Sequence, residues 1–266
     1  MTRGESGYAV LAMVATMVTI AATIVVGWAT FASRVQADGL AQVQQAYLDE
    51  VRAALLGWYV RELAQVDRRP EAPEPAAVLR EAGIAPRWGL RLATSERLER
   101  EGIAYRVLAA WLPGEGDASA LDPATGQFTP SSGARWITVS GFDLQAGAMA
   151  ETRARLDRLA RHLESAYRAR LLSDPSRDAT VNRFRAVRCA APAAGELPCI
   201  DDYAALDASG LALAVGLERL LLSNVWGASI EASNGVDASP VMPFSMALRT
   251  TTPWGSRVSL FAVAAP

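Results

Sequence analysis

The chain has 266 residues, of which 51% are hydrophobic and 20% charged, and its formal net charge at pH 7 is −2. This near-neutral balance excludes the basic excess that is typical of nucleic-acid-binding proteins, so no nucleic acid is expected as a partner. About 230 residues follow an apolar N-terminal segment, which is enough for one large or two small domains with cores of their own.

The first segment of the chain is uncharged over residues 8–31, with Glu5 the last charge before it and Arg34 the first after it. As a helix of about 1.5 Å rise per residue, this segment would span roughly 36 Å, more than the ~30 Å of a bilayer core. We therefore expect a leader over residues 1–7, a transmembrane segment over 8–31, a cytoplasmic N-terminus and an exported remainder. An ordinary signal anchor remains an alternative.

The apolar pattern continues beyond this segment, over residues 32–68. Apolar residues recur there at intervals of three to five positions, which predicts an amphipathic continuation of the same helix. The residues of this stripe are Leu40, Val43, Tyr47, Val51, Leu55, Trp58 and Leu63. The first proline is Pro70, so one long helix is expected from about Tyr8 to about Val66.

The remainder is predicted to be a β-rich head in two lobes, over residues 69–145 and 146–266. In the first lobe we expect a short helix over 75–83, strands over 88–94, 103–113 and 134–145, and a loop over 114–133. In the second lobe we expect helices over 146–172 and 203–223 and strands over 228–233, 244–252 and 256–265. The predicted fold class is therefore α+β, with a long N-terminal transmembrane and amphipathic helix before the head.

Cysteine and histidine are both rare in this chain. Cys189 and Cys199 are the only cysteines and His162 is the only histidine, which is too few ligands for a usual zinc site. In an exported domain the two cysteines predict a disulfide. Asp201–Asp202 and the loop Glu231–Asp237 could bind calcium, but neither has EF-hand spacing and surface solvation is the favoured interpretation. No catalytic motif occurs, so no enzyme, cofactor or metal site is expected.

Together, the short leader with its glycines, the uncharged span, the long helix and the β-rich head with a late disulfide resemble the type IV pilin superfamily. The start "GYAVLA" is similar to minor pilins of conjugative and type IVb systems, and "NVWG" is similar to the turn before the head sheet of pseudopilins. The resemblance implies cleavage by a prepilin peptidase after Gly7 and N-methylation of Tyr8, with cleavage between Gly4 and Glu5 as the alternative.

One departure from the pilin pattern concerns the fifth residue after the cut, where major pilins usually carry a glutamate. After cleavage at Gly7 that residue is Ala12, and after cleavage at Gly4 it is Ala9. The missing acid and the bulky head imply a tip subunit or another minor subunit of a filament, and tip and shaft positions both stay open. The implied partners are the membrane, other pilin subunits, the prepilin peptidase, the assembly platform and a surface receptor. The implied location is first the inner membrane, with the head in the periplasm, and then the cell-surface filament.

Small residues within the span offer a surface for close helix packing. They are Ala12, Thr16, Thr19, Thr23 and Gly27, although an alanine-rich composition is an alternative reason for their presence. Two other functions stay open at this point: a single-pass exported binding or sensor domain that does not polymerise, and a minor pseudopilin of type II secretion. The sequence does not distinguish among adhesion, motility, DNA uptake, conjugation and secretion as the process served.

Overall fold

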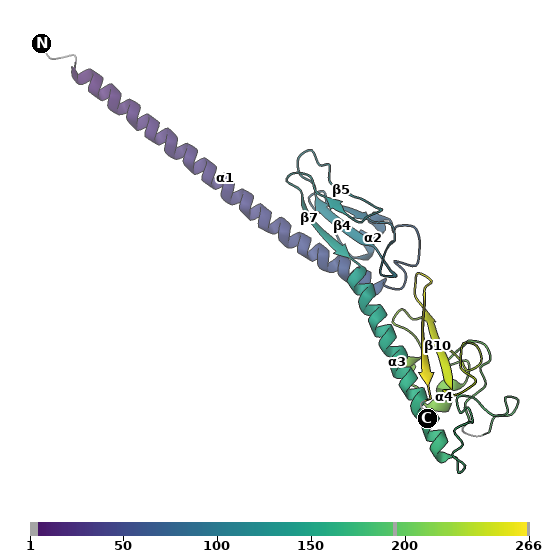
Figure 1. The fold of residues 1–266 in the computed structure, drawn as a ribbon. Coiled ribbons are helices and arrows are strands. Elements are labelled where there is room, and N and C mark those ends of the chain that lie inside the picture. The colour runs from purple at the N-terminus through teal and green to yellow at the C-terminus, as the bar shows by residue number, and fades with distance from the viewer. Residues whose placement is uncertain (1–4, 194–195, 265–266) are drawn as a thin grey trace.

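The computed structural model describes the backbone of residues 5–193 and 196–264. Within the first helix, the side chains of residues 5–16, 18, 20, 21, 32–35 and 37 lie outside the description. That helix, α1 (Glu5–Arg61), has 57 residues and is roughly 85 Å long at 1.5 Å per residue. It projects from the rest of the molecule as one continuous rod (Figure 1).

Helix α1 ends earlier than the sequence indicates. The predicted end near Val66 is wrong, because the chain leaves the helix after Arg61 and continues in turns toward Pro70. Tertiary contacts explain the difference: the carbonyl of Val66 and the carboxylate of Asp67 are both hydrogen-bonded inside the head. If the helix continued to residue 66, the Val66 carbonyl and the Asp67 carboxylate would not lie where these hydrogen bonds form.

Only the later part of the predicted apolar stripe is buried. Tyr47, Val51, Leu55 and Trp58 are buried, whereas Leu40 and Val43 are 51% and 55% exposed. The apolar side chains of this stripe are therefore buried against the head only from about Tyr47 onward. Leu40 and Val43 belong to the same pattern but remain more than half exposed.

The first lobe is a three-stranded antiparallel sheet in the order β1-β4-β7, packed against α1. Its sheet strands are β1 (Arg91–Thr94), β4 (Val107–Leu112) and β7 (Arg135–Ser140). Helix α2 (Pro75–Glu81) packs beside α1 and β1, and two hairpins extend the lobe. The hairpins are β2 (Leu98–Arg100) with β3 (Ile103–Tyr105), and β5 (Ala120–Leu121) with β6 (Phe128–Thr129).

Two strand predictions in this lobe need correction. The predicted strand 103–113 is divided at Arg106 into β3 and β4, because the guanidinium of Arg106 turns into the protein interior. The predicted strand 134–145 ends at Ser140, and the next helix begins at Phe142. Gly141 lies between them, and a Cβ there would be 1.9 Å from the Tyr59 hydroxyl, so only glycine fits. The expected loop 114–133 contains the β5–β6 hairpin.

The second lobe packs the long helix α3 (Phe142–Ser173) against a four-stranded antiparallel sheet in the order β11-β10-β9-β8. Its strands are β8 (Ala204–Ala205), β9 (Glu231–Ser233), β10 (Ser245–Thr251) and β11 (Arg257–Val263). The lobe thus repeats the plan of the first one, a long helix on an antiparallel sheet (Figure 1). The mixed helix and sheet content confirms the α+β class.

The helix predicted over residues 203–223 is wrong. The segment instead forms strand β8, helix α4 (Leu211–Val215) and the 3-10 helix η1 (Arg219–Leu221). Gly210 and Gly216 flank α4 with φ of +74° and +67°, in the left-handed region that ends a right-handed helix. The apolar residues of this segment fill the second core instead, since Leu206 and Leu211 are fully buried beneath the sheet.

Each lobe has its own hydrophobic core, and a smaller cluster joins the two. The first core lies between α1 and the β1-β4-β7 sheet, and the second lies between α3 and the β8–β11 sheet. The joining cluster consists of Ala148, Met149 and Trp226, with Leu63 and Trp254 packed against it. The start of α3 therefore belongs to both lobes and fixes one against the other.

Candidate functional site: the projecting helix and its attachment to the head

The projecting half of α1, drawn as a ribbon in Figure 1, exposes a series of large apolar side chains. Its large apolar side chains are between 59% and 73% exposed: Met17, Ile24, Val25, Val26, Trp28 and Phe31. Successive residues of a helix point about 100° apart, so the consecutive residues 24–26 place apolar surface around most of the circumference. A helix that is apolar on all sides is normally buried in other protein or in lipid.

Two threonine hydroxyls of this segment are hydrogen-bonded within the helix itself. The hydroxyl of Thr23 donates to the carbonyl of Thr19, and the hydroxyl of Thr30 donates to the carbonyl of Val26 at 3.0 Å. A threonine bonded in this way presents its methyl group outward and can enter an apolar environment without an unpaired donor. These two threonines are therefore compatible with an apolar environment.

The residues predicted to mediate helix packing recur on one face of α1. Positions 12, 16, 19, 23 and 27 follow each other by three or four residues, the spacing of helix neighbours. A Cβ placed on Gly27 would meet no atom within 4 Å, so this face is open there. The side chains of Ala12 and Thr16 lie outside the described residues. At the predicted cleavage sites, the side chains of Glu5 and Tyr8 also lie outside the description. The backbone of Gly7 belongs to α1, whereas Gly4 lies outside the described backbone.

Among the residues that the structure describes, no helix combines the length and the apolar character that a membrane crossing requires. The predicted span 8–31 includes residues 8–16, 18, 20 and 21, whose side chains lie outside the description. The transmembrane segment therefore stays a prediction from the sequence.

Several long-range hydrogen bonds attach the C-terminal half of α1 to the first lobe. Arg135 donates from Nη1 to the carbonyl of Ala41 at 3.1 Å. The Tyr47 hydroxyl donates to the carbonyl of Ala85 at 2.8 Å, and the Trp58 indole donates to Glu81 Oε2 at 3.0 Å. From residue 41 onward α1 is thus held along its length, so its projecting half is a fixed extension of the head.

A buried polar network lies where α1, the two lobes and α3 meet. Asp67 is fully buried, and its Oδ2 accepts hydrogen bonds from the Tyr59 hydroxyl at 2.7 Å and from Gln145 Nε2 at 2.6 Å. Gln145 in turn accepts a hydrogen bond from the Trp226 indole at 2.8 Å. The network therefore connects α1 with α3 and with the turn that contains "NVWG" in the second lobe.

Arg106 is the cation of this network and is also fully buried. Its Nε lies 3.9 Å from Asp67 Oδ1, and its guanidinium donates to carbonyls of the chain that follows α1 and to one carbonyl just after β1. The carbonyl acceptors are those of Val66, Arg69, Pro70, Glu71 and Ser95. Burial raises the pKa of Asp67, which its hydrogen bonds and the charge of Arg106 oppose, and burial lowers the pKa of Arg106.

Sequence reasoning did not identify this network. The available signal was Arg106 itself, a charged residue inside the otherwise apolar segment "IAYRVLAAWLP". A charge in such a segment is expensive to bury unless it is paired, so it indicates a specific partner. The partner Asp67 lies 39 positions earlier, in a turn, where no pattern distinguishes it from the neighbouring surface charges.

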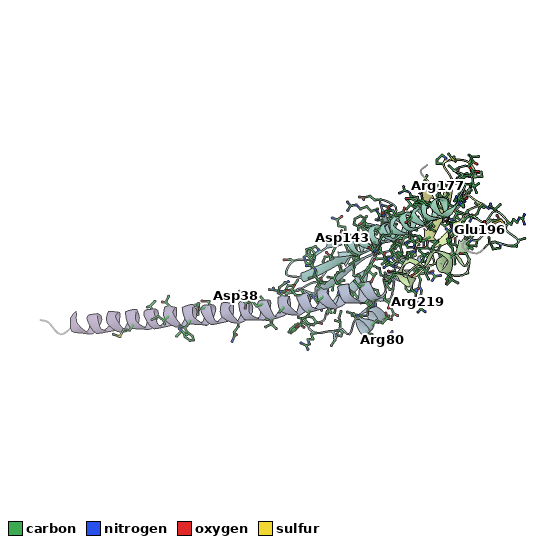
Figure 2. All side chains as sticks on the ribbon, turned by 90° about the horizontal axis from the view of Figure 1, so that it is seen from below. Asp38, Arg80, Asp143, Arg177, Glu196 and Arg219 are labelled. Atoms are coloured by element: carbon green, nitrogen blue, oxygen red, sulfur yellow. A yellow bond between two sulfur atoms is a disulfide. The ribbon has the colours of Figure 1, made fainter. Side chains whose placement is uncertain are left out.

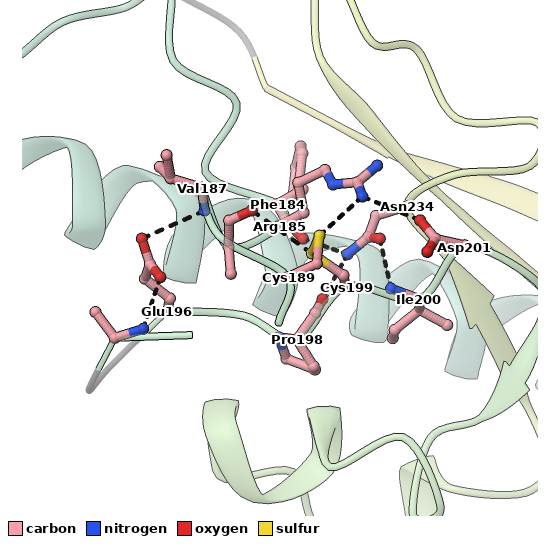
Figure 3. Close-up of a disulfide and its surroundings, with 12 residues drawn as sticks. Phe184, Arg185, Val187, Cys189, Glu196, Pro198, Cys199, Ile200, Asp201 and Asn234 are labelled. Carbon is pink, nitrogen blue, oxygen red and sulfur yellow. Dashed lines mark hydrogen bonds and ion pairs between the residues drawn. A yellow bond between two sulfur atoms is a disulfide. The ribbon is translucent and has the colours of Figure 1, made fainter. Parts of the chain in front are cut away.

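Cys189 and Cys199 form a disulfide, which confirms the prediction. Figure 3 shows the surrounding contacts: Arg185 Nη2 donates to Cys189 Sγ at 3.1 Å and to Asp201 Oδ1 at 3.0 Å. Asn234 donates from Nδ2 to the carbonyls of Phe184 and Pro198 and accepts from the Ile200 amide. The disulfide and Asn234 together hold residues 184–189 and 198–200 against the second sheet.

Replacing both Cys189 and Cys199 by alanine is expected to lower the free energy of unfolding by about 2–3 kcal/mol, since the short covalent ring no longer restricts the unfolded chain. Urea denaturation of the variant and of the wild type, with and without reductant, measures this. Reductant should destabilise the wild type and leave the variant unchanged. Equal midpoints for wild type and variant without reductant would contradict the prediction.

The candidate calcium positions carry ordinary surface interactions. Asp201 pairs with Arg185, Glu231 pairs with Arg249 at 2.6 Å, and Asp237 accepts the Tyr203 hydroxyl at 2.9 Å. In the described ranges, no group of three or more His, Cys, Asp or Glu side chains is placed to hold a metal ion. His162 is exposed on α3, with Nε2 2.9 Å from the carbonyl of Val215.

Comparison with models of protein families, with curated proteins and with solved structures finds no match for this chain. Its function must therefore be inferred from the projecting helix, the head and the way the two are joined.

Proposed function

We propose that this chain is a minor structural subunit of a type IV pilus-like filament. The observation that supports this most strongly is the division of α1 into two parts. The later part contributes to the core of the first lobe, whereas the large apolar side chains described on the projecting part are each more than half exposed: Met17, Ile24, Val25, Val26, Trp28 and Phe31. A second apolar environment is needed to cover that surface.

Lipid and a filament interior can each provide that environment. In the proposed cycle the helix is held in the inner membrane, with the N-terminus cytoplasmic and the head periplasmic, and then packs among the helices of other subunits. Both surroundings are apolar, so the transfer depends on close packing rather than on hydrophobicity. The face that carries Thr19, Thr23 and Gly27 offers small residues for that contact.

The missing acid at Ala12 supports a position at the filament tip. A carboxylate in a low-dielectric interior is stabilising only when paired, and in a shaft each such acid would neutralise the terminal amine of a neighbour. A subunit with Ala12 cannot provide this charge to the next subunit. At the tip, no further subunit docks that would need its terminal amine neutralised by this carboxylate.

Processing by a prepilin peptidase tests the proposal directly. Gly7→Asp is expected to leave full-length precursor in the membrane, whereas the wild type should begin with N-methylated Tyr8. Gly4→Ala is the matched control and should be processed normally. Mass spectrometry of the purified N-terminal peptide reads the outcome. A wild-type chain that is intact from Met1 would overturn the pilin proposal and favour an anchored exported domain that does not polymerise.

A further inference from the structure

The last strand of the chain, β11, is an edge of the second sheet and runs beside α3 (Figure 1). Figure 2 shows the length of α3, from Asp143 near its start to Arg177 just beyond its end. Strand β11 has seven residues and pairs only with β10 among the described strands, whereas the opposite edge, β8, has two residues. An open edge of this length can add a strand from another chain.

The register of β11 against β10 fixes which of its backbone groups point outward. The amide of Ala264 donates to the carbonyl of Phe244, and in an antiparallel pair the bonded residues alternate along each strand. The amides and carbonyls of Arg257, Ser259 and Phe261 therefore point away from β10. Among the described residues, none of these groups has a hydrogen-bond partner. The outer edge of β11 thus offers a row of unpaired donors and acceptors.

Helix α3 covers one end of this edge. The amide of Val263 donates to Glu164 Oε1 at 3.1 Å, which also confirms that the odd-numbered amides point outward. Glu164 belongs to the middle of α3, so its side chain reaches over the outer side of the strand. The part of the edge that stays open for pairing is therefore residues 257–261.

A charged stripe of α3 runs along the open edge. Residues three or four positions apart share one side of a helix, and on the side of Glu164 the preceding members are Arg153, Asp157 and Arg161. Asp157 pairs with Arg161 at 2.8 Å. Arg153 is exposed and has no carboxylate within 4 Å among the described residues. Val258 packs against the cluster at the start of α3, so the open edge lies beside Arg153.

The two faces of β11 differ in character. Val258, Leu260 and Ala262 face the second core and α3, whereas Phe261 and Val263 lie on the opposite face, 46% and 40% exposed. Side chains of an added strand would alternate in the same way, one set beside the exposed apolar pair and the other set toward the stripe of α3. Apolar residues on the first face and acidic residues on the second would match these surroundings.

We propose that the outer edge of β11 binds an extended segment of another protein in which apolar and acidic residues alternate. Backbone hydrogen bonds to residues 257–261 would hold the segment, and Arg153 would pair with one of its acids. A second copy of this chain fits less well, because antiparallel pairing of two β11 edges would bring two like stripes, each with unpaired Arg153, toward each other. The proposal does not depend on the projecting helix or on filament assembly.

Fluorescence anisotropy of a labelled peptide with the full chain in nonionic detergent tests the proposal. The probe is a peptide as long as β11 in which valine and glutamate alternate. We expect this peptide to bind, and the same peptide with N-methylated backbone amides not to bind, because it lacks the donors that a ladder needs. A peptide with lysine in place of glutamate should bind at least about threefold more weakly.

Variants of the edge and of the stripe locate the binding. Ser259→Pro removes an outward amide without removing a bond to β10, and it should weaken binding at least about tenfold. Ser259→Ala keeps the amide and is the matched control, with affinity unchanged within about twofold. Arg153→Glu should weaken binding at least about threefold. Arg219→Glu makes the same charge change at an exposed position on η1 and should have no effect.

Several results would overturn the proposal: no peptide binding at millimolar concentration, equal binding of the N-methylated or the lysine peptide, or equal losses in S259P and S259A. Dimerisation of the chain in sedimentation experiments that S259P abolishes would assign the edge to a second copy instead. Thermal unfolding checks that S259P is folded. If it is not, the comparison of Arg153→Glu with Arg219→Glu decides, and equal affinities of these two variants would count against the edge as the binding site.

Discussion

Replacing Arg106 by methionine is expected to lower the free energy of unfolding by about 3–5 kcal/mol, because it leaves a buried carboxylate without its cation. Asp67 would keep its hydrogen bonds from Tyr59 and Gln145 but lose the only positive charge within 4 Å among the described residues. The five carbonyls that Arg106 now binds would lose their donor as well. Urea denaturation at pH 7 measures the loss.

The pH dependence of this loss follows from the direction of the Asp67 pKa. Burial raises this pKa above its ordinary 3.8, so the folded state holds the proton more tightly than the unfolded state. The associated stability is fully present below pH 3.8 and is lost as the pH rises through the folded pKa. Removing Arg106 raises that pKa further, so the deficit of R106M should grow as the pH increases from about 4 to 7.

The double variant Arg106→Met with Asp67→Leu provides the control. It removes both charges and should recover a large part of the stability, as replacing a buried ion pair by apolar residues often does. Two results would show that the pairing of Arg106 with Asp67 does not stabilise the junction. The first is a stability deficit in R106M that does not change with pH. The second is a double variant whose loss of stability equals the sum of the losses in Arg106→Met alone and Asp67→Leu alone.

Ile24→Asp is expected to exclude the chain from membranes and filaments while leaving the head folded. A charged side chain in the middle of an apolar helix costs about 2.5–3.5 kcal/mol on insertion, so the fraction recovered should fall on the order of 100-fold. Ile24 is 61% exposed and lies outside both lobe cores, so the thermal unfolding of the head should not change. Quantitative mass spectrometry of membrane and sheared-filament fractions measures the recovered fraction.

Gln36→Asp is the matched control for this substitution. Gln36 is also exposed on α1, but it lies beyond the predicted span 8–31, where an added charge meets no apolar environment. Its recovery should equal that of the wild type. If Ile24→Asp is recovered as well as Gln36→Asp from both fractions, the projecting segment is not embedded in lipid or in other subunits, and the proposed function is wrong.

The sequence determined those features that depend on local pattern or on scarcity. The absence of proline before Pro70 and the recurring apolar residues predict one long helix, since helix formation depends on neighbours three and four positions apart. The disulfide followed from there being only Cys189 and Cys199 to pair. The α+β class followed from segments that alternate between helical and strand-like periods.

The tertiary structure decided the features that depend on distant partners. Leu40 and Tyr47 belong to the same apolar pattern of α1, yet only Tyr47 is buried. The difference depends on where the β1-β4-β7 sheet meets α1. The predicted helix 203–223 does not form, because Gly210 and Gly216 have left-handed backbone conformations that interrupt it, and Leu206 and Leu211 are buried in the second core instead. Asp67 and Arg106 are separated by 39 positions, and only the fold brings them together. A charge pair of that separation leaves no local pattern, because its stability comes from the low dielectric of a core that the rest of the chain must first form.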